Sequence, residues 1–370
     1  MADNKNAPCC GPSKLVKIDF IKVKTLSQLT VGGKTVPVVG GAWSFNDHLG
    51  RIFVRLGLRR MNYAIKPGLY AVGLPEASSR VFVSANYKLS FDILRREVSG
   101  LNAWLLVIDT KGVNVWCAAG KGTFGTQELI ASVRETGLDS TVSHRELVVP
   151  QLGASGVSAH LVKRDSKFNI VYGPVRARDI KKFLGNGAKA DEDMRQVSFN
   201  LFDRLTVVLL ELSLALKSVI LITLALLAAA LAAYYSGIFK SAYIQAYFLA
   251  AAVWTGYFSG TLLFAALLPW LPFRAFSLNG ALAGFAGAFI ALLSFGLFGH
   301  LDIYLFEIIS FSAISSAVAA YLALNFTGSS TYTSLSGVKK ELKYAIPAIA
   351  AGASAGLLVM IAGFIIKGAA

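Results

Sequence analysis

The chain has 370 residues, of which 55% are hydrophobic, and its formal net charge at pH 7 is +15. This apolar fraction exceeds the usual range for soluble domains, so an ordinary soluble enzyme is excluded as a description of the whole chain. Residues 1–217 contain 30 of the 36 Lys and Arg residues and 18 of the 21 Asp and Glu residues. The sequence therefore predicts a polar, basic domain followed by a membrane domain.

The basic balance does not by itself indicate a nucleic-acid partner. Apart from Arg51 to Arg60, the charges are scattered, and no nucleic-acid-binding motif occurs. A cytoplasmic domain beside anionic lipid would carry the same balance. So would a domain that binds an acidic protein, such as a ferredoxin-like electron donor. We therefore expect no nucleic-acid partner.

The first 184 residues divide into an N-terminal segment, 1–35, which we expect to be partly disordered, and an α/β domain, 36–184. Apolar runs alternate with helical patterns at the spacing of βαβ units, which predicts a Rossmann-like domain with a mainly parallel sheet. The glycine- and proline-rich stretch 66–75 reads as a connection. Arg95 and Arg96 are expected to be exposed on their helix. The predicted strands are 36–39, 81–84, 103–109, 147–149 and 168–172, and the predicted helices are 47–58, 88–99, 127–136, 157–162 and 175–183.

Residues 185–217 are expected to form a linker and a juxtamembrane helix, which either lies on the membrane surface or extends the first spanning helix inward. Residues 218–370 then contain five apolar stretches, each near the ~20 residues that cross a bilayer. The bias of Lys and Arg between the loops predicts a multi-pass protein of the cell (inner) membrane with its soluble domain in the cytoplasm. The stretches are 218–238, 243–268, 278–299, 303–326 and 344–366.

The segment Asn114-Val-Trp-Cys-Ala-Ala-Gly-Lys-Gly122 follows the strongest predicted strand and contains Cys117, one of three cysteines. Read from its residues, it allows three interpretations. Cys117 is a small buried hydrophobe, or Gly120-x-Gly-x-x-Gly125 binds a dinucleotide, or Cys117 is a ligand to a metal already held by a macrocycle. Zinc is excluded because no Cys or His partner stands at a zinc spacing nearby.

The octapeptide Asn114-Val-Trp-Cys-Ala-Ala-Gly-Lys121 resembles the signature of the mercury-methylating corrinoid protein family, HgcA. That family is similar to the corrinoid iron–sulfur protein large subunit of acetyl-CoA synthesis. The wider resemblance runs from Val81-Phe-Val-Ser-Ala-Asn-Tyr-Lys88 to Pro174, and the five-helix membrane tail fits it too.

The resemblance implies that the domain binds cobalamin and that Cys117 is the lower axial ligand of cobalt. It implies methyl transfer to Hg(II), a methyl-donating methyltransferase or methyl carrier, and a ferredoxin-like iron–sulfur electron donor. Two roles are possible for Trp116, which either packs beneath the corrin ring or fills the protein core. Two are also possible for Lys121, which either contacts the cofactor's phosphate tail or is solvated. The sequence does not decide between them. The expected cofactor-binding residues are Asn114, Val115, Trp116, Cys117, Ala118, Ala119, Gly120, Lys121, Gly122, Thr123, Gly153 and Ala154.

Two of these expected residues come from a second loop. Gln151 to Gly156 also follows a predicted strand and is rich in small residues, so the two loops could line one cleft. The alternative is a pair of tight turns without a ligand. The adjacent residues Cys9 and Cys10 either have no functional role or bind Hg(II), because thiolates prefer soft metal ions. Two alternative functions stay open: a membrane-anchored corrinoid methyl carrier of one-carbon metabolism, and a nucleotide-binding regulatory domain.

Overall fold

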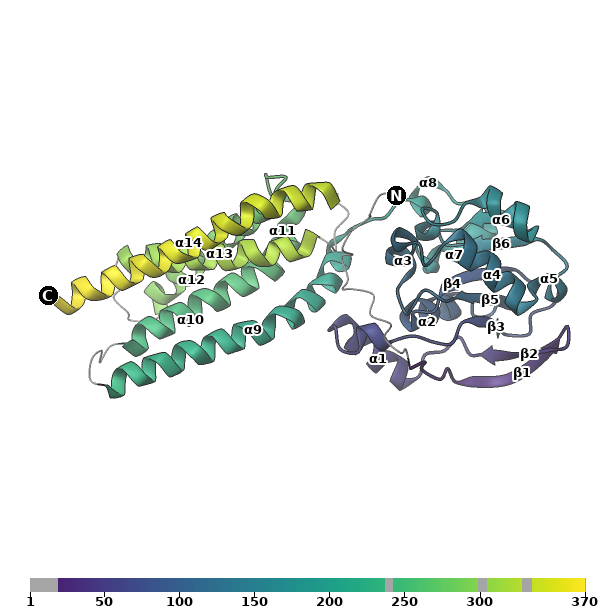
Figure 1. Ribbon diagram of the computed structural model, residues 1–370, viewed down its shortest axis with the longest axis horizontal. Helices are drawn as coiled ribbons and strands as arrows, with labels where there is room; N and C mark the ends of the chain where they lie inside the picture. Colours follow the sequence, from purple (N-terminus) through teal and green to yellow (C-terminus); the bar gives the residue numbers. More distant parts are fainter. Residues whose placement is uncertain (1–18, 237–241, 299–304, 328–334, 370) are drawn as a thin grey trace, which may run out of the picture. The chain divides into compact units, whose positions relative to one another are not determined.

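The computed structural model describes residues 19–236, 242–298, 305–327 and 335–369. It contains two compact units (Figure 1). The first comprises the described residues up to Val54 together with Leu58–Ser198, and the second comprises Arg55–Gly57 together with Phe199–Ala370. Each unit is described separately below.

The first unit is an α/β domain. Its elements in chain order are β1 (Thr25–Val31), β2 (Lys34–Val39), α1 (Phe45–Arg55), η1 (Arg60–Asn62), β3 (Gly68–Val72), β4 (Val81–Ala85), α2 (Lys88–Glu97), β5 (Ala103–Ile108), α3 (Val115–Lys121), α4 (Thr126–Thr136), α5 (Leu138–Thr141), β6 (Glu146–Val149), η2 (Gln151–Gly153), α6 (Ala159–Ser166), β7 (Asn169–Tyr172), η3 (Ala177–Asp179), α7 (Ile180–Gly185) and α8 (Glu192–Arg195).

The strands form one seven-stranded sheet in the order β1-β2-β3-β5-β4-β6-β7. Four neighbouring pairs are parallel, and the β1–β2 and β3–β5 pairs are antiparallel. Every residue of β4 and β5 is buried, as expected for central strands covered on both faces. Because β5, β4 and β6 are mutually parallel neighbours, their carboxyl ends meet at one edge of the sheet. The predicted mainly parallel α/β fold is confirmed.

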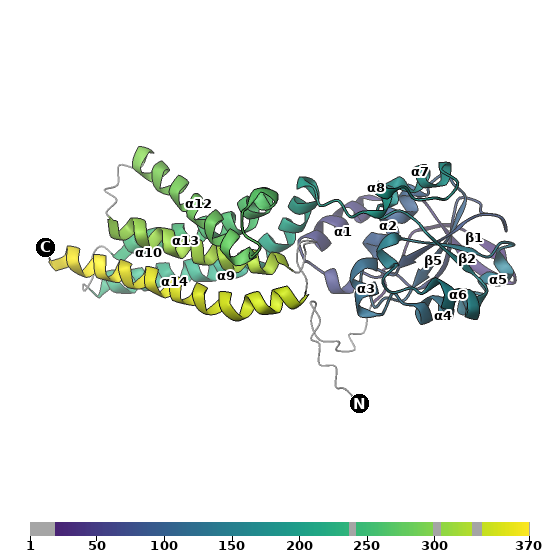
Figure 2. The same cartoon turned by 90° about the horizontal axis from the view of Figure 1, so that it is seen from above.

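Helices cover both faces of this sheet (Figures 1 and 2). Alternate residues of each strand point to opposite faces. On one face Val83 and Leu106 pack with Leu129 of α4 and Val162 of α6. On the other face Phe82 and Leu105 pack with Phe91 of α2, Phe183 of α7 and Met194 of α8.

Two strands of the sheet were not predicted. β3 lies between Pro67 and Gly73, which the sequence analysis took as the ends of a connection; its five residues pair with β2 and β5. β1 is the edge strand, and most of its residues are exposed. Its residues therefore do not alternate between a buried face and an exposed face. Tertiary pairing, which a local pattern does not contain, determines both strands.

The second unit is helical. Its elements are α9 (Leu201–Tyr235), α10 (Ala242–Phe258), the π-helix η4 (Ser259–Leu263), α11 (Phe264–Leu267), η5 (Leu268–Trp270), α12 (Phe276–Phe298), α13 (Leu305–Phe326) and α14 (Leu335–Ala369). Together they supply five segments long and apolar enough to cross a membrane, as the sequence predicts. The stretch from Leu201 to Lys217, expected to be juxtamembrane, is part of α9.

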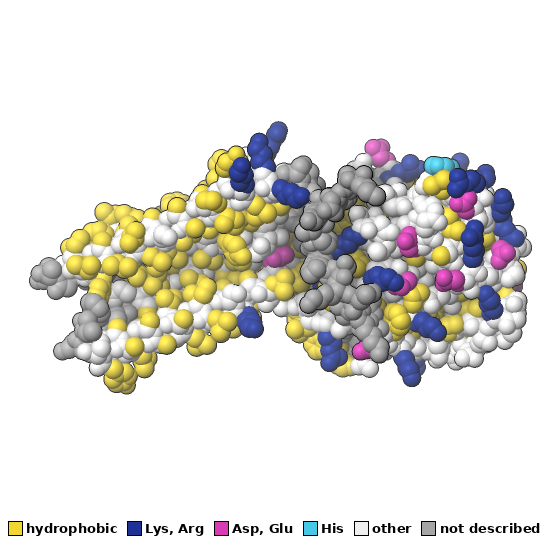
Figure 3. All heavy atoms as spheres, viewed as in Figure 1, with side chains coloured by type: hydrophobic (Ala, Val, Ile, Leu, Met, Phe, Trp, Pro, Cys, Tyr) yellow, Lys and Arg dark blue, Asp and Glu magenta, His cyan; other side chains and the backbone are white. Residues whose placement is uncertain are grey.

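Close helix packing in this unit depends on glycine. A Cβ on Gly280 or Gly284 of α12 would come within 2.5 Å of Ala323 and 2.6 Å of the Ser315 carbonyl oxygen of α13. These glycines therefore let the two helix backbones approach, as the Gly-x-x-x-Gly spacing predicts. Hydrophobic side chains dominate the visible face of the helical unit, whereas Lys and Arg are interspersed with Asp and Glu on the α/β unit (Figure 3).

Candidate functional site

The segment around Cys117 is a helix. No helix is predicted for this segment, but α3 begins at Val115 and includes Cys117 and Gly120. The side chain of Asn114 caps the helix by accepting a hydrogen bond from the backbone nitrogen of Cys117 at 2.9 Å. Gly122 ends it at a φ of 78°. Since Ala, Cys and Lys tolerate a helix and only Gly120 opposes it, the cap and the terminal glycine together set its two ends.

The two faces of α3 differ in burial. Val115, Ala118 and Ala119, spaced i, i+3 and i+4, are buried against the sheet. The opposite face carries Trp116, Cys117 and, one turn later, Gly120 and Lys121. The Trp116 side chain is 46% exposed, which rules out core filling, one of its two expected roles. The Cys117 residue is half-buried, in the first turn, where backbone N–H groups favour negative charge.

The second glycine-containing loop packs against the buried side of this region. A Cβ on Gly156 would lie 3.1 Å from Ala119 Cα and 2.3 Å from the Phe124 carbonyl oxygen. A Cβ on Gly153 would lie 2.5 Å from the Phe124 ring. The structure therefore brings the two loops together as expected, with Gly153 in a packing position against Phe124 and Ala154 half-buried beside it. Contact of Gly153 and Ala154 with a cofactor stays a prediction.

The open face of α3 has room for a flat group. A Cβ built on Gly120 or Gly122 would meet no described atom within 4 Å beyond its chain neighbours and its own helix backbone. The hydroxyl oxygen of Thr123, two residues after the helix, is buried and has no hydrogen-bond partner among the residues that the structure describes. A buried hydroxyl without a partner is costly unless a ligand or water supplies one. The thiol, the open glycines and this hydroxyl fit a corrinoid; nearby Thr126, by contrast, accepts a hydrogen bond from the Ser158 backbone nitrogen at 2.9 Å.

A buried amide beneath α3 fixes the loop that leads into it. Asn86 follows β4, is fully buried, and donates from Nδ2 to Asp109 Oδ1 at 3.1 Å. Its Oδ1 accepts hydrogen bonds from the backbone nitrogens of Thr110 and Gly112, both at 3.0 Å, and lies 2.8 Å from the Thr110 hydroxyl. The end of one central strand thus holds the loop that leaves the neighbouring strand. The sequence analysis did not single out Asn86, although it lies in the quoted stretch Val81 to Lys88.

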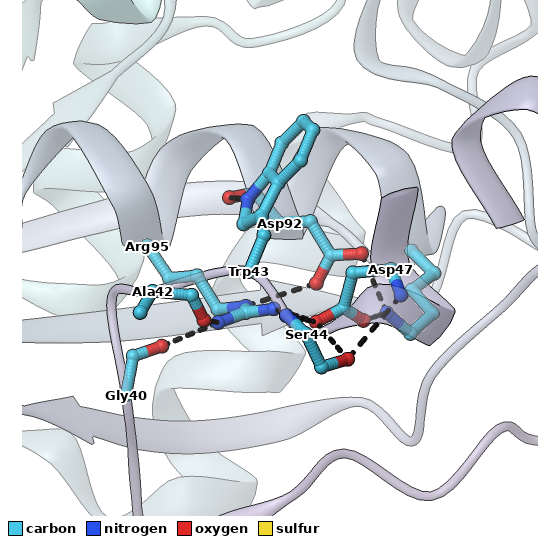
Figure 4. A network of polar contacts seen from close by, with 8 residues as sticks. Gly40, Ala42, Trp43, Ser44, Asp47, Asp92 and Arg95 are labelled. Carbon is cyan, nitrogen blue, oxygen red and sulfur yellow. Dashed lines mark hydrogen bonds and ion pairs between the residues drawn. The ribbon is translucent and has the colours of Figure 1, made fainter. Parts of the chain in front are cut away.

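A second polar cluster joins α2 to the start of α1 (Figure 4). Lys88 Nζ lies 2.5 Å from both Asp47 Oδ1 and Asp92 Oδ2. Arg95 pairs with Asp92 at 2.9 Å and with Asp47 at 2.8 Å, and it also donates to the Gly40 and Ala42 carbonyls. Arg95 is only 5% exposed, so its expected exposure is wrong, whereas the Arg96 side chain is 47% exposed. Lys88, Asp92 and Arg95 are spaced i, i+4 and i+7, so they lie on one face of α2. This spacing could have indicated the cluster from the sequence.

The electrostatics of this cluster favour the ionised form of Asp47. Burial disfavours the charged form of Asp47, but hydrogen bonds and attraction from Lys88, with hydrogen bonds from Ser44, outweigh burial and hold the pKa of Asp47 well below its usual range. Burial, followed by repulsion from Asp92 and Asp47, raises the pKa of Tyr63. The Asp47 carboxylate therefore stays ionised at pH values at which the same group in the unfolded chain would be protonated.

The remaining expected site residues divide between described and undescribed parts of the chain. Cys9 and Cys10 lie outside the described residues, so their expected role is not tested. Lys121 is exposed on the open face of α3. Within the described ranges, no three His, Cys, Asp or Glu side chains converge as a metal-binding group.

The glycines of the dinucleotide pattern do not form a strand-to-helix turn. Gly120 lies within α3, Gly122 ends that helix, and Gly125 is the N-cap of α4. In a dinucleotide site these glycines would follow a strand directly, so that a helix N-terminus faces the pyrophosphate. Here α3 stands between β5 and the glycines, which argues against this interpretation.

Comparisons with known proteins point to one complex. Residues 59–184 match the family model described as CO dehydrogenase/acetyl-CoA synthase delta subunit. The chain is 29% identical over 122 residues to the acetyl-CoA decarbonylase/synthase complex subunit gamma of Archaeoglobus fulgidus, covering 32% of this chain and 26% of that protein. It is 35% identical over 98 residues to the subunit of the same name from Methanocaldococcus jannaschii, covering 26% of this chain and 20% of that protein. The chain therefore spans a fifth to a quarter of the length of these relatives. The residues that match the family model lie in the α/β unit that carries α3.

Proposed function

We propose that residues 36–184 bind cobalamin on the open face of α3 and that the Cys117 thiolate is the lower ligand of its cobalt. The observation that carries this proposal is the half-buried thiol of Cys117 on a helix face where Gly120 leaves open space. The resemblance of Asn114 to Lys121 to a corrinoid-protein signature supports it. So does the similarity of residues 59–184 to the acetyl-CoA synthase family.

A bound corrinoid supplies a cobalt atom whose reactivity toward methyl groups depends on its axial ligand. The chain supplies the sulfur donor and fixes its position through the Asn114 cap. Gly120 and Gly122 leave space for the ring, and the exposed Trp116 indole lies beside the thiol on the same helix face. We propose that the Thr123 hydroxyl contacts the polar side groups of the cofactor and that Lys121, which is exposed on this face, contacts its phosphate.

The methyl acceptor in this proposal is Hg(II), and the product is methylmercury. The octapeptide Asn114 to Lys121 supports this acceptor, because it resembles the signature of the mercury-methylating family. The chain has three cysteines, which are too few for a four-cysteine iron–sulfur cluster of its own. We therefore propose a ferredoxin-like electron donor and a separate methyl-donating protein as partners, with Cys9 and Cys10 receiving Hg(II).

The second candidate is a membrane-anchored methyl carrier of one-carbon metabolism. The relatives named as acetyl-CoA decarbonylase/synthase subunits favour it. Both candidates use the same α/β unit and the same cofactor, and they differ in the methyl acceptor. In both, five spans hold the protein in the bilayer, and we propose that the α/β unit faces the cytoplasm.

The experiment is a pair of assays on the full-length chain purified anaerobically in detergent. Gel filtration after incubation with cobalamin tests binding, because the pigment must elute with the protein. Methyl transfer from protein-bound methylcobalamin is then measured to Hg(II) and, separately, to the acetyl-CoA synthase of a methanogen. Methylmercury formation supports the first candidate, transfer only to the synthase supports the second, and absence of bound pigment contradicts both.

A further inference from the structure

Helix α1 differs from the usual surface helix of a soluble domain, because charged side chains face the protein and apolar side chains are exposed. Two of its charged residues point inward: Asp47 reaches Lys88 and Arg95, and the Arg51 guanidinium lies 5.0 Å from the centre of the Trp43 ring. Val54 is buried on the same side. A Cβ on Gly50 would lie 2.3 Å from the Tyr63 hydroxyl, so this glycine also belongs to the inner side. These positions follow the i, i+3, i+4, i+7 pattern of one helix face.

The outer face of α1 is correspondingly apolar. Phe45 is 79% exposed, Ile52 is 49% exposed, and Phe53 is 39% exposed. The turn after the helix continues this surface with exposed Leu58 and Met61. Single exposed apolar residues are common on soluble proteins, but a contiguous set on one helix and its following turn marks an interaction surface.

Basic residues border this apolar surface. Arg55 ends α1, Arg59 lies in the following turn, and Arg60 begins η1. A helix with an apolar face bordered by arginines is the usual composition of an element that lies in the interface of a membrane. Each arginine near an anionic lipid surface is worth about 1 kcal/mol of binding.

The end of α1 also belongs to the compact unit that contains the spanning helices. Arg55–Gly57 group with Phe199–Ala370, and within that unit the Ser213 hydroxyl donates a hydrogen bond to the Leu56 carbonyl at 2.5 Å. Helix α9 has 35 residues, so it is about 52 Å long, whereas the hydrocarbon core is about 30 Å thick. Ser213 lies one turn before Lys217, in the charged part of α9 that precedes its apolar span.

We propose that the outer face of α1 and the turn that follows it lie on the bilayer surface. Phe45, Ile52 and Phe53 enter the boundary between headgroups and acyl chains, while Arg55, Arg59 and Arg60 contact lipid phosphates. The lipid surface is the occupant that fits best, because the same chain spans the bilayer and carries its arginines beside the apolar face. Since Asp47 of this helix pairs with Lys88 and Arg95, α1 would also connect the membrane surface with α2.

The test measures the membrane depth of a nitroxide on the full-length chain in lipid nanodiscs. The label is attached to Ile52→Cys in a background of Cys9→Ser, Cys10→Ser and Cys117→Ala. Power-saturation EPR compares collisions with oxygen, which concentrates in lipid, and with a water-soluble nickel chelate. The matched control is a label at Gln127→Cys, an exposed position on α4.

In nanodiscs that contain phosphatidylglycerol, the Ile52 label is expected to collide more with oxygen than with nickel, and the Gln127 label is expected to do the reverse. Adding Arg59→Gln and Arg60→Gln should lower the oxygen preference of the Ile52 label severalfold. A nickel-accessible Ile52 label in phosphatidylglycerol and phosphatidylcholine alike would overturn the proposal. A label shielded from both reagents would also overturn it, because a protein would then cover this face.

Discussion

The amide oxygen of Asn86 accepts a hydrogen bond from the backbone nitrogen of Thr110 at 3.0 Å and lies 2.8 Å from its hydroxyl. Asn86 follows β4, and Thr110 lies in the loop that connects β5 to α3. Because the Asn86 residue is fully buried, water cannot replace these contacts. The position of the helix that carries Cys117 therefore depends on a side chain from the neighbouring strand.

Replacing Asn86 with Ala is expected to destabilise the α/β unit by about 1–3 kcal/mol, because the nitrogens of Thr110 and Gly112 lose their acceptor in a buried site. Under the proposed function, the visible spectrum of bound cobalamin should also change, since the loop before α3 is released. Thermal unfolding and anaerobic absorption spectra measure the two effects. Asn169→Ala, at an exposed position of β7, is the control. An unchanged spectrum in the Asn86 variant would contradict the positioning role.

Gly120→Leu separates stability from cofactor binding. Gly120 is inside a helix, where replacing glycine removes a cost of up to ~1 kcal/mol. A Cβ there meets no described atom within 4 Å outside its own helix. We expect unchanged or higher thermal stability together with at least tenfold weaker cobalamin binding. Gly185→Leu, at an exposed helix end that is also open, should leave binding unchanged. Equal cobalamin affinity in the Gly120 variant and the parent would place the cofactor away from this face.

The buried charges on α2 predict a large effect of a single substitution. Asp92→Ala leaves Lys88 and Arg95 buried without one of their two carboxylate partners, which costs about 3–5 kcal/mol. Chemical denaturation of the full-length chain in detergent, followed by near-UV circular dichroism, measures this loss. Asp165→Asn removes a surface pair with Arg164 and should unfold close to the parent. Similar midpoints for the two variants would show that the cluster is solvated.

The lowered pKa of Asp47 predicts that the folded protein loses stability as the pH becomes acidic. Its pKa is lower in the folded protein than its ordinary value of 3.8, so the unfolded chain binds a proton first as the pH falls. The stabilisation by Asp47 is thus complete above pH 3.8 and decreases as the pH falls from there toward the folded pKa. Asp47→Asn should be less stable at pH 6 and should lose part of this acid slope. Parallel stability–pH curves for parent and variant would contradict the prediction.

Much of the fold follows from local sequence. β4 and β5 are buried apolar runs, and the five spans are long apolar helices, so both patterns are readable without tertiary information. β3 is five residues between a proline and a glycine, and it exists because β2 and β5 pair with it. Its prediction would require knowledge of those partners.

The candidate site divides in the same way. The octapeptide identifies Cys117 and its neighbours as a unit, but their helical conformation depends on the Asn114 cap and on packing against Gly156. Asn86 and Arg95 are polar residues whose burial comes from elements distant in sequence. A pattern of polar residues alone predicts exposure, which is correct for Arg96 and wrong for Arg95.

The central claim is that the Cys117 sulfur is a ligand of cobalt. The most direct measurement is the anaerobic visible absorption spectrum of cobalamin bound to the full-length chain, recorded beside Cys117→Ala. The account predicts a thiolate-ligated spectrum in the parent and its loss in the variant, with cobalamin still bound. Identical spectra for the two bound proteins would contradict the assignment of Cys117 as the ligand.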